Sequence, residues 1–79
     1  MSDIYTLSSL EEGEECCVRN LMMEGVMRSR LSDLGLIEGT RVVCLQKSFS
    51  GDPTAFLIRG AVIALRREDS SRVEVERCT

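Results

Sequence analysis

The segment 30–40 constrains the fold more than any other stretch, because it ends a helix and begins a strand within a few residues. Leu31 and Leu34 lie one helical turn apart, and Gly35 follows at the position where a left-handed residue closes a helix. Leu36 is then placed to fold back onto the last turn, and a second glycine permits another reversal before the strand. The segment therefore predicts a helix that is joined to a β-sheet by a short connection.

Hydrophobic periodicity around this segment predicts one helix and five strands. Apolar residues at helical spacing place one stripe on a helix that begins near Gly25: Met23, Met27, Leu31 and Leu34, with Val26 beside them. Strands are predicted at Glu15–Leu21, Thr40–Lys47, Thr54–Arg59, Ala61–Arg66 and Arg72–Glu76. Arg59-Gly60 predicts a tight hairpin turn with the glycine at positive φ, and residues 66–71 predict a polar corner with a 3₁₀ turn. The result is a mainly β protein, a small and highly curved barrel with the helix between the first and second strands.

The four cysteines divide according to the face of the strand on which they lie. Cys16 and Cys44 fall on apolar faces beside valines, so we expect both to be small core residues. Cys17 points the other way, and two neighbours in a strand cannot easily bind one metal ion. Cys78 stands near the end of the chain, where we expect mobility. If the last strand pairs with the first, Cys17 and Cys78 approach each other, and a two-thiolate metal site or a disulfide there is a minor alternative.

Length and composition bound how the chain is organised. Its 79 residues, 43% hydrophobic and 29% charged, suit one domain over residues 1–79, with residues 1–6 and 77–79 frayed and with Leu7 and Leu10 packed on the barrel. The longest apolar run, Ala61–Leu65, is far shorter than the roughly twenty residues that cross a bilayer. The first residues also lack the pattern of a signal peptide. We therefore expect a cytoplasmic protein with free thiols and no direct membrane insertion.

The residue inventory disfavours several classes of function. The chain contains no histidine, which excludes Cys-His and Ser-His nucleophiles and histidine-rich metal sites. It has no glycine- and lysine-containing phosphate loop. A net charge of −3, with one tyrosine, two phenylalanines and no tryptophan, argues against a nucleic-acid partner. We expect a non-enzymatic protein that binds other proteins.

One hairpin carries the best candidate for a binding surface. Leu57 and Val62 are expected to face outward on its two strands with two alanines beside them, and exposed apolar residues grouped in this way can mark a partner surface. Arg59, Arg66 and Arg67 surround them and could form ion pairs with an acidic partner, although solvated charge is the simpler interpretation. In the alternative, the helix or the N-terminal arm covers the apolar pair.

Three stretches occur in a distinctive order and spacing. They are RLSDLGLIEGTRV from Arg30, SGDP at Ser50 to Pro53, and IRGAVIALRREDSSRV at Ile58 to Val73. Together they resemble the FeoA family, which consists of small cytoplasmic SH3-like barrel proteins associated with bacterial ferrous iron transport. The resemblance covers roughly Leu7 to Glu76. The chain departs from the family's usual pattern at Ala61, often a bulkier aromatic residue there, and at Cys44, usually an aliphatic one.

The resemblance implies an accessory protein of ferrous iron uptake that contacts the cytoplasmic GTP-binding region of the permease FeoB. No cofactor is firmly implied, and Fe2+ is the transition metal to consider. We expect a monomer or weak dimer. Two alternatives remain open: a metal-responsive module that acts in trans, like the SH3-like C-terminal part of iron-dependent repressors, and a thiol-based iron or zinc carrier that uses Cys17 and Cys78.

Overall fold

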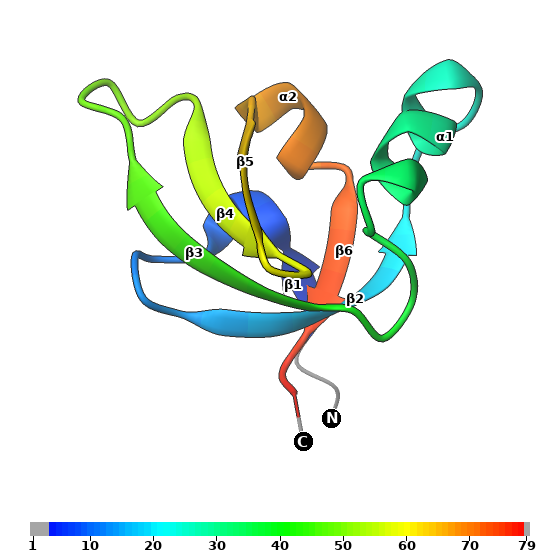
Figure 1. Cartoon of the computed structure of the whole chain (residues 1–79), viewed down its shortest axis with the longest axis horizontal. Coiled ribbons are helices and arrows are strands. Elements are labelled where there is room, and N and C mark those ends of the chain that lie inside the picture. Colours follow the sequence, from blue (N-terminus) through cyan, green and yellow to red (C-terminus); the bar gives the residue numbers. More distant parts are fainter. Residues whose placement is uncertain (1–3, 79) are drawn as a thin grey trace.

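In the computed structural model, which describes residues 4–78, the chain runs through six strands and three short helices (Figure 1). The elements are β1 (Ile4–Thr6), the 3₁₀ helix η1 (Leu7–Ser9), β2 (Glu15–Leu21), α1 (Val26–Asp33), β3 (Arg41–Lys47), β4 (Thr54–Ile58), β5 (Ala61–Leu65), α2 (Arg67–Ser70) and β6 (Val73–Glu76). None of the helices within residues 4–78 has the length and apolar character that a membrane span needs.

The six strands form one antiparallel sheet in the order β1-β6-β2-β3-β4-β5. Bulges interrupt the register between Val18 and Asn20 in β2 and between Cys44 and Gln46 in β3. A bulge bends its strand and increases the local twist, so these two strands carry the sheet around the core (Figure 1). The outcome is the small SH3-like barrel that the sequence predicts.

Successive side chains of each strand point to opposite faces of the sheet, and one of these faces lines the interior. Strands β2, β3, β4 and β6 contribute core side chains that are almost fully buried: Cys16, Val18, Val42, Cys44, Phe56, Ile58, Val73 and Val75. Leu7, the first residue of η1, and Leu10, which follows η1, are also buried against this core. The predicted inward faces of these strands, and the packing of the N-terminal arm, are confirmed.

The connection between α1 and β3 has the geometry that its glycine predicts. Gly35 has a φ of 109°, its N–H donates to the carbonyl of Ser32 at 3.0 Å, and the N–H of Leu36 donates to the carbonyl of Leu31 at 3.0 Å. These two bonds form a Schellman cap, which brings residues 31 and 36 together. Leu31 and Leu36 are both buried, so the cap fixes the end of the helix to the barrel.

The apolar stripe predicted for the helix is only partly right. Leu31 is the buried residue of α1, whereas Leu34 is 39% exposed and Val26 is 81% exposed. Met23 is buried, but it lies in the link before α1 rather than on the helix. Leu31 and the partly buried Met27 pack against the core from α1, and the Schellman cap fixes the C-terminal end of this eight-residue helix.

The chain ends are more ordered than the sequence predicts. Residues 4–6, expected to fray, form β1 and pair with β6 in a register that places Ile4 opposite Glu76. Three residues are too few for an alternating pattern to predict a strand. Cys78, expected to be mobile, is held by a disulfide. Residues 1–3 and 79 of the predicted frayed ends lie outside the described residues, and the single-domain organisation stays a prediction.

The two turns that flank β5 differ in detail from the predicted ones. Arg59 and Gly60 both have positive φ, at 50° and 83°, so the hairpin turn uses two left-handed residues and not the glycine alone. The polar corner contains one turn of α-helix, α2, where a 3₁₀ turn was expected.

Candidate protein-binding surface

The outer surface of β3, β4 and β5 is a continuous apolar face. The strand register brings Val43, Leu57 and Val62 side by side across the three strands. In the next row Ala55 lies opposite Ala64. We call these residues, together with the neighbouring residue of the β3 bulge, the outer patch: Val43, Leu45, Ala55, Leu57, Val62 and Ala64.

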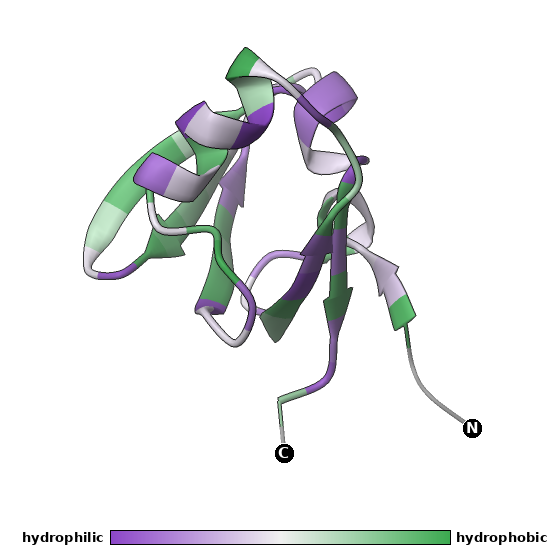
Figure 2. Cartoon of the chain, turned by 90° about the vertical axis from the view of Figure 1, so that its right-hand side faces the viewer, coloured by the Kyte–Doolittle hydropathy of each residue, from purple (hydrophilic) through white to green (hydrophobic). Residues whose placement is uncertain are grey.

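The outer patch is open to solvent. Val62 is 67% exposed and Leu45 is 40% exposed, and Leu57 is half-buried. The alternative in which the helix or the N-terminal arm covers this hairpin is therefore wrong for Val62. Figure 2 shows the β4–β5 hairpin as largely hydrophobic. Because monomeric proteins rarely leave a contiguous apolar face exposed without use, the patch is a candidate partner surface.

Two small residues leave a hollow in the outer patch. Ala55 and Ala64 face each other, while the next row carries the larger Leu57 and Val62. The hollow has a volume of about 220 Å³ and is lined by Gln46, Lys47, Ser48, Pro53, Ala55 and Ala64. Such a recess beside an apolar ridge can receive an apolar side chain of a partner, with polar groups at its rim for hydrogen bonds.

The three arginines predicted around this surface lie at its two ends. Arg66 follows β5 in an extended conformation and is exposed, so it continues the outward alternation of that strand. Arg67 begins α2 at the same end, and Arg59 occupies the hairpin turn at the other end. None of the three takes part in the ion pairs found among residues 4–78. Their charges are thus available to carboxylates of a partner.

Arg59 also borders a second hollow that the sequence did not reveal. This hollow has a volume of about 470 Å³ and is lined by Glu38, Gly39, Thr40, Arg41 and Arg59. The aliphatic part of the Arg59 side chain lies against Gly35, so that a Cβ on the glycine would be 2.5 Å from Arg59 Cδ. The second hollow therefore connects the hairpin turn to the helix–strand connection.

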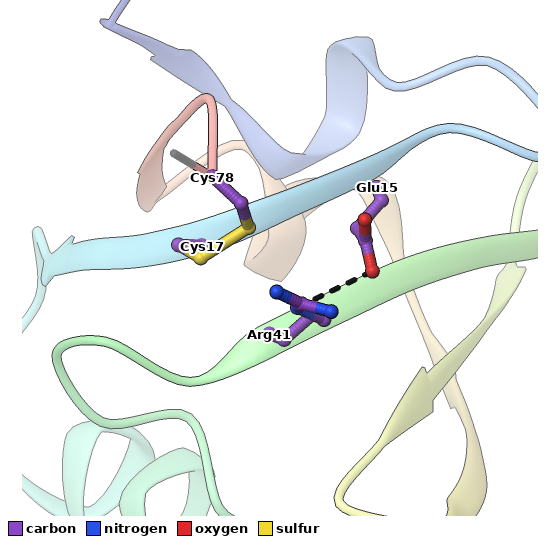
Figure 3. The surroundings of a disulfide bond; sticks show 4 residues. All are labelled: Glu15, Cys17, Arg41 and Cys78. Carbon is purple, nitrogen blue, oxygen red and sulfur yellow. Dashed lines mark ion pairs between the residues drawn. A yellow bond between two sulfur atoms is a disulfide. The ribbon is translucent and has the colours of Figure 1, made fainter.

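Cys17 and Cys78 form a disulfide on the outer face of β2 (Figure 3). Strands β2 and β6 pair with Cys17 opposite Glu76, which brings Cys78, two residues further along, to the same face. Their Cα atoms are 5.3 Å apart. The expected free thiols and the expected mobility of Cys78 are wrong for this pair. The approach of the two cysteines, held as a minor alternative, is confirmed.

Cys16 and Cys44 are free and buried, as predicted. Burial raises the pKa of the Cys16 thiol to about 12, and the nearby carboxylate of Glu15 adds to the effect. Burial also raises the pKa of Cys44, although Lys47 opposes the shift. Both thiols stay protonated near neutral pH, so neither is a ready nucleophile or metal ligand.

The described residues do not form a resident metal site. Within residues 4–78 no group of three or more potential thiolate or carboxylate ligands lies close enough together to hold an ion. The carboxylates on the disulfide's face of the sheet are already paired, Glu15 with Arg41 at 3.3 Å and Glu76 with Arg19 at 3.2 Å. The residues around the cysteine pair therefore do not fit a bound Fe2+ or Zn2+ in the oxidised form.

The fold and this surface define a class of protein: a small SH3-like barrel with an apolar outer sheet face. The particular family is also shown. Residues 5–77 match the FeoA domain, and the chain belongs to that family.

Relatives confirm the resemblance seen in the sequence. The Fe(2+) transport protein A/Fe(2+) transporter FeoB fusion protein of Porphyromonas gingivalis is 31% identical over 70 residues, which is 89% of this chain and 8% of the fusion protein. The solution structure of FeoA from Chlorobium tepidum superposes with a TM-score of 0.87 at 30% identity, over 94% of this chain and 70% of that one. The crystal structure of Stenotrophomonas maltophilia FeoA complexed with zinc, described as a prokaryotic SH3 domain protein, gives a TM-score of 0.81 at 27% identity, over 90% and 88% of the two chains.

Four residues of the outer patch are predictable from the sequence, and two are not. The hairpin turn, which connects neighbouring strands directly, pairs Leu57 with Val62. Val43 and Leu45 were placed on an outward face, but nothing local to their strand indicated that β3 pairs with β4 in this register. Lengths of loop between strands were the available signal, and they do not fix register.

Proposed function

We propose that this protein is a non-enzymatic accessory protein of ferrous iron uptake, which binds the cytoplasmic GTP-binding region of the permease FeoB through the outer patch. One observation carries the proposal: an exposed apolar sheet face, in a member of the FeoA domain family, has at both ends arginines that form no ion pair within residues 4–78. The relative from Porphyromonas gingivalis, named as a fusion of transport protein A with FeoB, supports FeoB as the partner. The protein would act in the cytoplasm, as a monomer or weak dimer, without a nucleic-acid partner.

The outer patch suggests what the partner surface looks like. A stable interface needs roughly 800 Å² from each protein, with its binding energy concentrated in a few central apolar contacts. Leu57 and Val62 supply such a ridge, and the hollow between Ala55 and Ala64 supplies a socket. The matching region of FeoB would carry a protruding apolar side chain with Asp or Glu placed to meet Arg66.

Amide chemical shifts of the ¹⁵N-labelled protein, titrated with the separately expressed GTP-binding region of FeoB, test the proposal. We expect shifts centred on Leu57, Val62 and Arg66. The variant Val62→Asp should weaken binding at least about tenfold, because it places a charge in the apolar contact. Val26→Asp is the matched control, since Val26 is more exposed than Val62 but lies on α1.

The possible results distinguish a wrong binding surface from a wrong partner. Thermal melts must first show that both variants are folded. If Val62→Asp binds like the wild type, or if the shifts map to another face, the outer patch is not the FeoB site. If the GTP-binding region causes no shifts at millimolar concentration, the proposed partnership itself fails.

A second candidate function follows from the cysteine pair. The structure brings Cys17 and Cys78 together, as a thiol-based carrier of Fe2+ or Zn2+ would require, and the relative from Stenotrophomonas maltophilia was solved with zinc. Two thiolates would be available only after reduction. Anaerobic titration of the reduced protein with Zn2+ should then show stoichiometric binding that the double variant C17S/C78S loses. Equal binding by the wild type and the double variant would exclude the carrier.

A further inference from the structure

We propose that Cys17 and Cys78 are a thiol–disulfide switch, which a low-molecular-weight disulfide such as oxidised glutathione closes and a thiol reductant opens. In the closed state the segment after β6 is tied to the outer face of β2, and in the open state it is released. This inference does not depend on FeoB, because it concerns the C-terminal end of β6 and not the outer patch.

The sheet itself holds the two cysteines together. They are 61 residues apart in the sequence, but β2 and β6 are hydrogen-bonded neighbours. The strand pairing survives reduction, because β6 is also paired with β1 and its two valines are buried in the core. Once reduced, the thiols therefore stay close, and closure is an intramolecular step with a high effective concentration.

Thiol–disulfide exchange is selective for Cys17 and Cys78 over the other two cysteines. Cys17 and Cys78 are half-buried, so small thiols and disulfides can reach them. Cys16 is next to Cys17 in the sequence, but it points to the opposite face and is fully buried. Burial also raises the pKa of both remaining thiols, Cys16 and Cys44, which suppresses their thiolates. The chain thus contains one exchangeable pair and one protected pair.

The exchange needs no metal and no oxidant other than oxidised glutathione. The Cys78 thiolate attacks one sulfur of oxidised glutathione, the glutathione S–S bond breaks, and one glutathione thiolate leaves. The Cys17 thiolate then attacks the Cys78 sulfur of the mixed disulfide, and the second glutathione leaves. Two protein thiols are oxidised, one glutathione disulfide is reduced to two thiols, and the two protons from the cysteines end on the glutathione molecules.

The switch acts on the short segment that follows β6. Arg77 and Cys78 are the described residues beyond β6, and the disulfide joins this segment covalently to β2. Cys17 lies opposite Arg41 in the β2–β3 register, and Arg41 pairs with Glu15 (Figure 3). Arg41 also lines the second hollow. Reduction therefore removes the covalent link between Cys78 and β2 and leaves a free Cys17 thiol opposite Arg41, which lines that hollow, while the barrel stays intact.

Equilibration of the full chain in glutathione buffers, from fully reduced to fully oxidised, tests the switch. After an acid quench and denaturing alkylation, intact mass should change from four alkylated thiols to two, and the change should reverse when the buffer is changed back. Peptide mapping should place the disulfide between Cys17 and Cys78. Amide shifts in the reduced protein should be confined to residues near position 17 and to the end of β6.

Two variants keep the test decisive. Cys78→Ser should still fold, since it changes one atom near the chain end, and its Cys17 should take up one glutathione in the oxidised buffer. Cys16→Ala should switch like the wild type. The proposal is overturned if the pair stays reduced in fully oxidised buffer, if it stays closed in excess dithiothreitol and so acts as a permanent crosslink, or if the mapped disulfide contains Cys16 or Cys44.

Discussion

The side chain of Arg59 rests on Gly35, at a distance that leaves no room for a Cβ on the glycine, which would be 2.5 Å from Arg59 Cδ. Both residues adopt positive φ, 109° for Gly35 and 50° for Arg59. One closes α1 and the other turns the β4–β5 hairpin, so the helix cap and the hairpin turn fit each other directly. The outer patch is thereby held in a fixed position relative to the helix.

Replacing Gly35 by alanine should therefore be more damaging than the same change at Gly39. Both glycines have positive φ, but among residues 4–78 no atom beyond the chain neighbours lies within 4 Å of a Cβ built on Gly39. We expect Gly39→Ala to cost about 1 kcal/mol for the left-handed backbone. Gly35→Ala should cost roughly 1–2 kcal/mol more, because Arg59 must move. Urea unfolding of the two variants gives the comparison.

The double variant Gly35→Ala/Arg59→Ala identifies the cause of that difference. If contact with Arg59 is responsible, the second change recovers most of the excess cost. Equal free energies of unfolding for the two single glycine variants would show that the side chain of Arg59 adapts without loss.

Alkaline pH should destabilise the protein through Cys16. Its pKa rises from an ordinary value of 9.0 to about 12 in the folded state, so the folded protein keeps the proton that the unfolded chain loses. Stability from this group is complete below pH 9 and is lost progressively as the pH rises towards 12. By pH 10 the loss is on the order of 1 kcal/mol.

Comparison with Cys16→Ala isolates this effect. The variant starts lower, because a core atom is missing. Its free energy of unfolding should nevertheless fall less steeply than that of the wild type between pH 8.5 and 10. Parallel pH profiles would mean that the Cys16 thiolate is tolerated in the core.

Loss of the disulfide should lower the stability of the oxidised protein. A crosslink between residues 61 apart restricts a large loop of the unfolded chain, and the chain-entropy model gives about 4 kcal/mol for a loop of this length. Cys78→Ser should therefore have a lower urea midpoint than the oxidised wild type. The wild type in reductant is the matched control and should unfold together with the variant. A variant as stable as the oxidised wild type would show that the crosslink adds nothing.

Charge reversal at Arg66 should weaken binding to the GTP-binding region of FeoB by about five- to tenfold at low salt. Arg66 is exposed, extends the outward face of β5 and has no ion-pair partner among the described residues. Because exposed charges are screened by salt, the difference between Arg66→Glu and the wild type should shrink as ionic strength rises. Arg30→Glu, exposed on α1, should bind like the wild type.

The sequence predicted what local patterns encode. Alternation in β3, β4 and β5 assigned Phe56 and Ile58 to the core and Leu57 to the surface, and all three are found there. Gly35 predicted the helix cap, because few other residues tolerate its φ.

What the sequence could not supply depends on pairing between distant strands. The pairing of β2 with β6 brings Cys17 close to Cys78, and no signal local to either cysteine predicts this pairing. The stripe on α1 failed for a different reason. An eight-residue helix that is fixed by its cap does not need to bury Val26 or Leu34, although their spacing fits a buried face.

The pairing of β1 with β6 has a consequence for how such a barrel can be attached to other proteins. Ile4 lies opposite Glu76, so the chain enters and leaves the barrel through adjacent strands, and neither strand belongs to the outer patch. A linker at either end would anchor the barrel at nearly the same point and leave the patch uncovered. A short flexible linker gives the attached protein an effective concentration in the millimolar range around the barrel. An interface too weak to hold two separate molecules together would then be enough for binding within one chain. Covalent attachment can therefore replace high intrinsic affinity in this architecture.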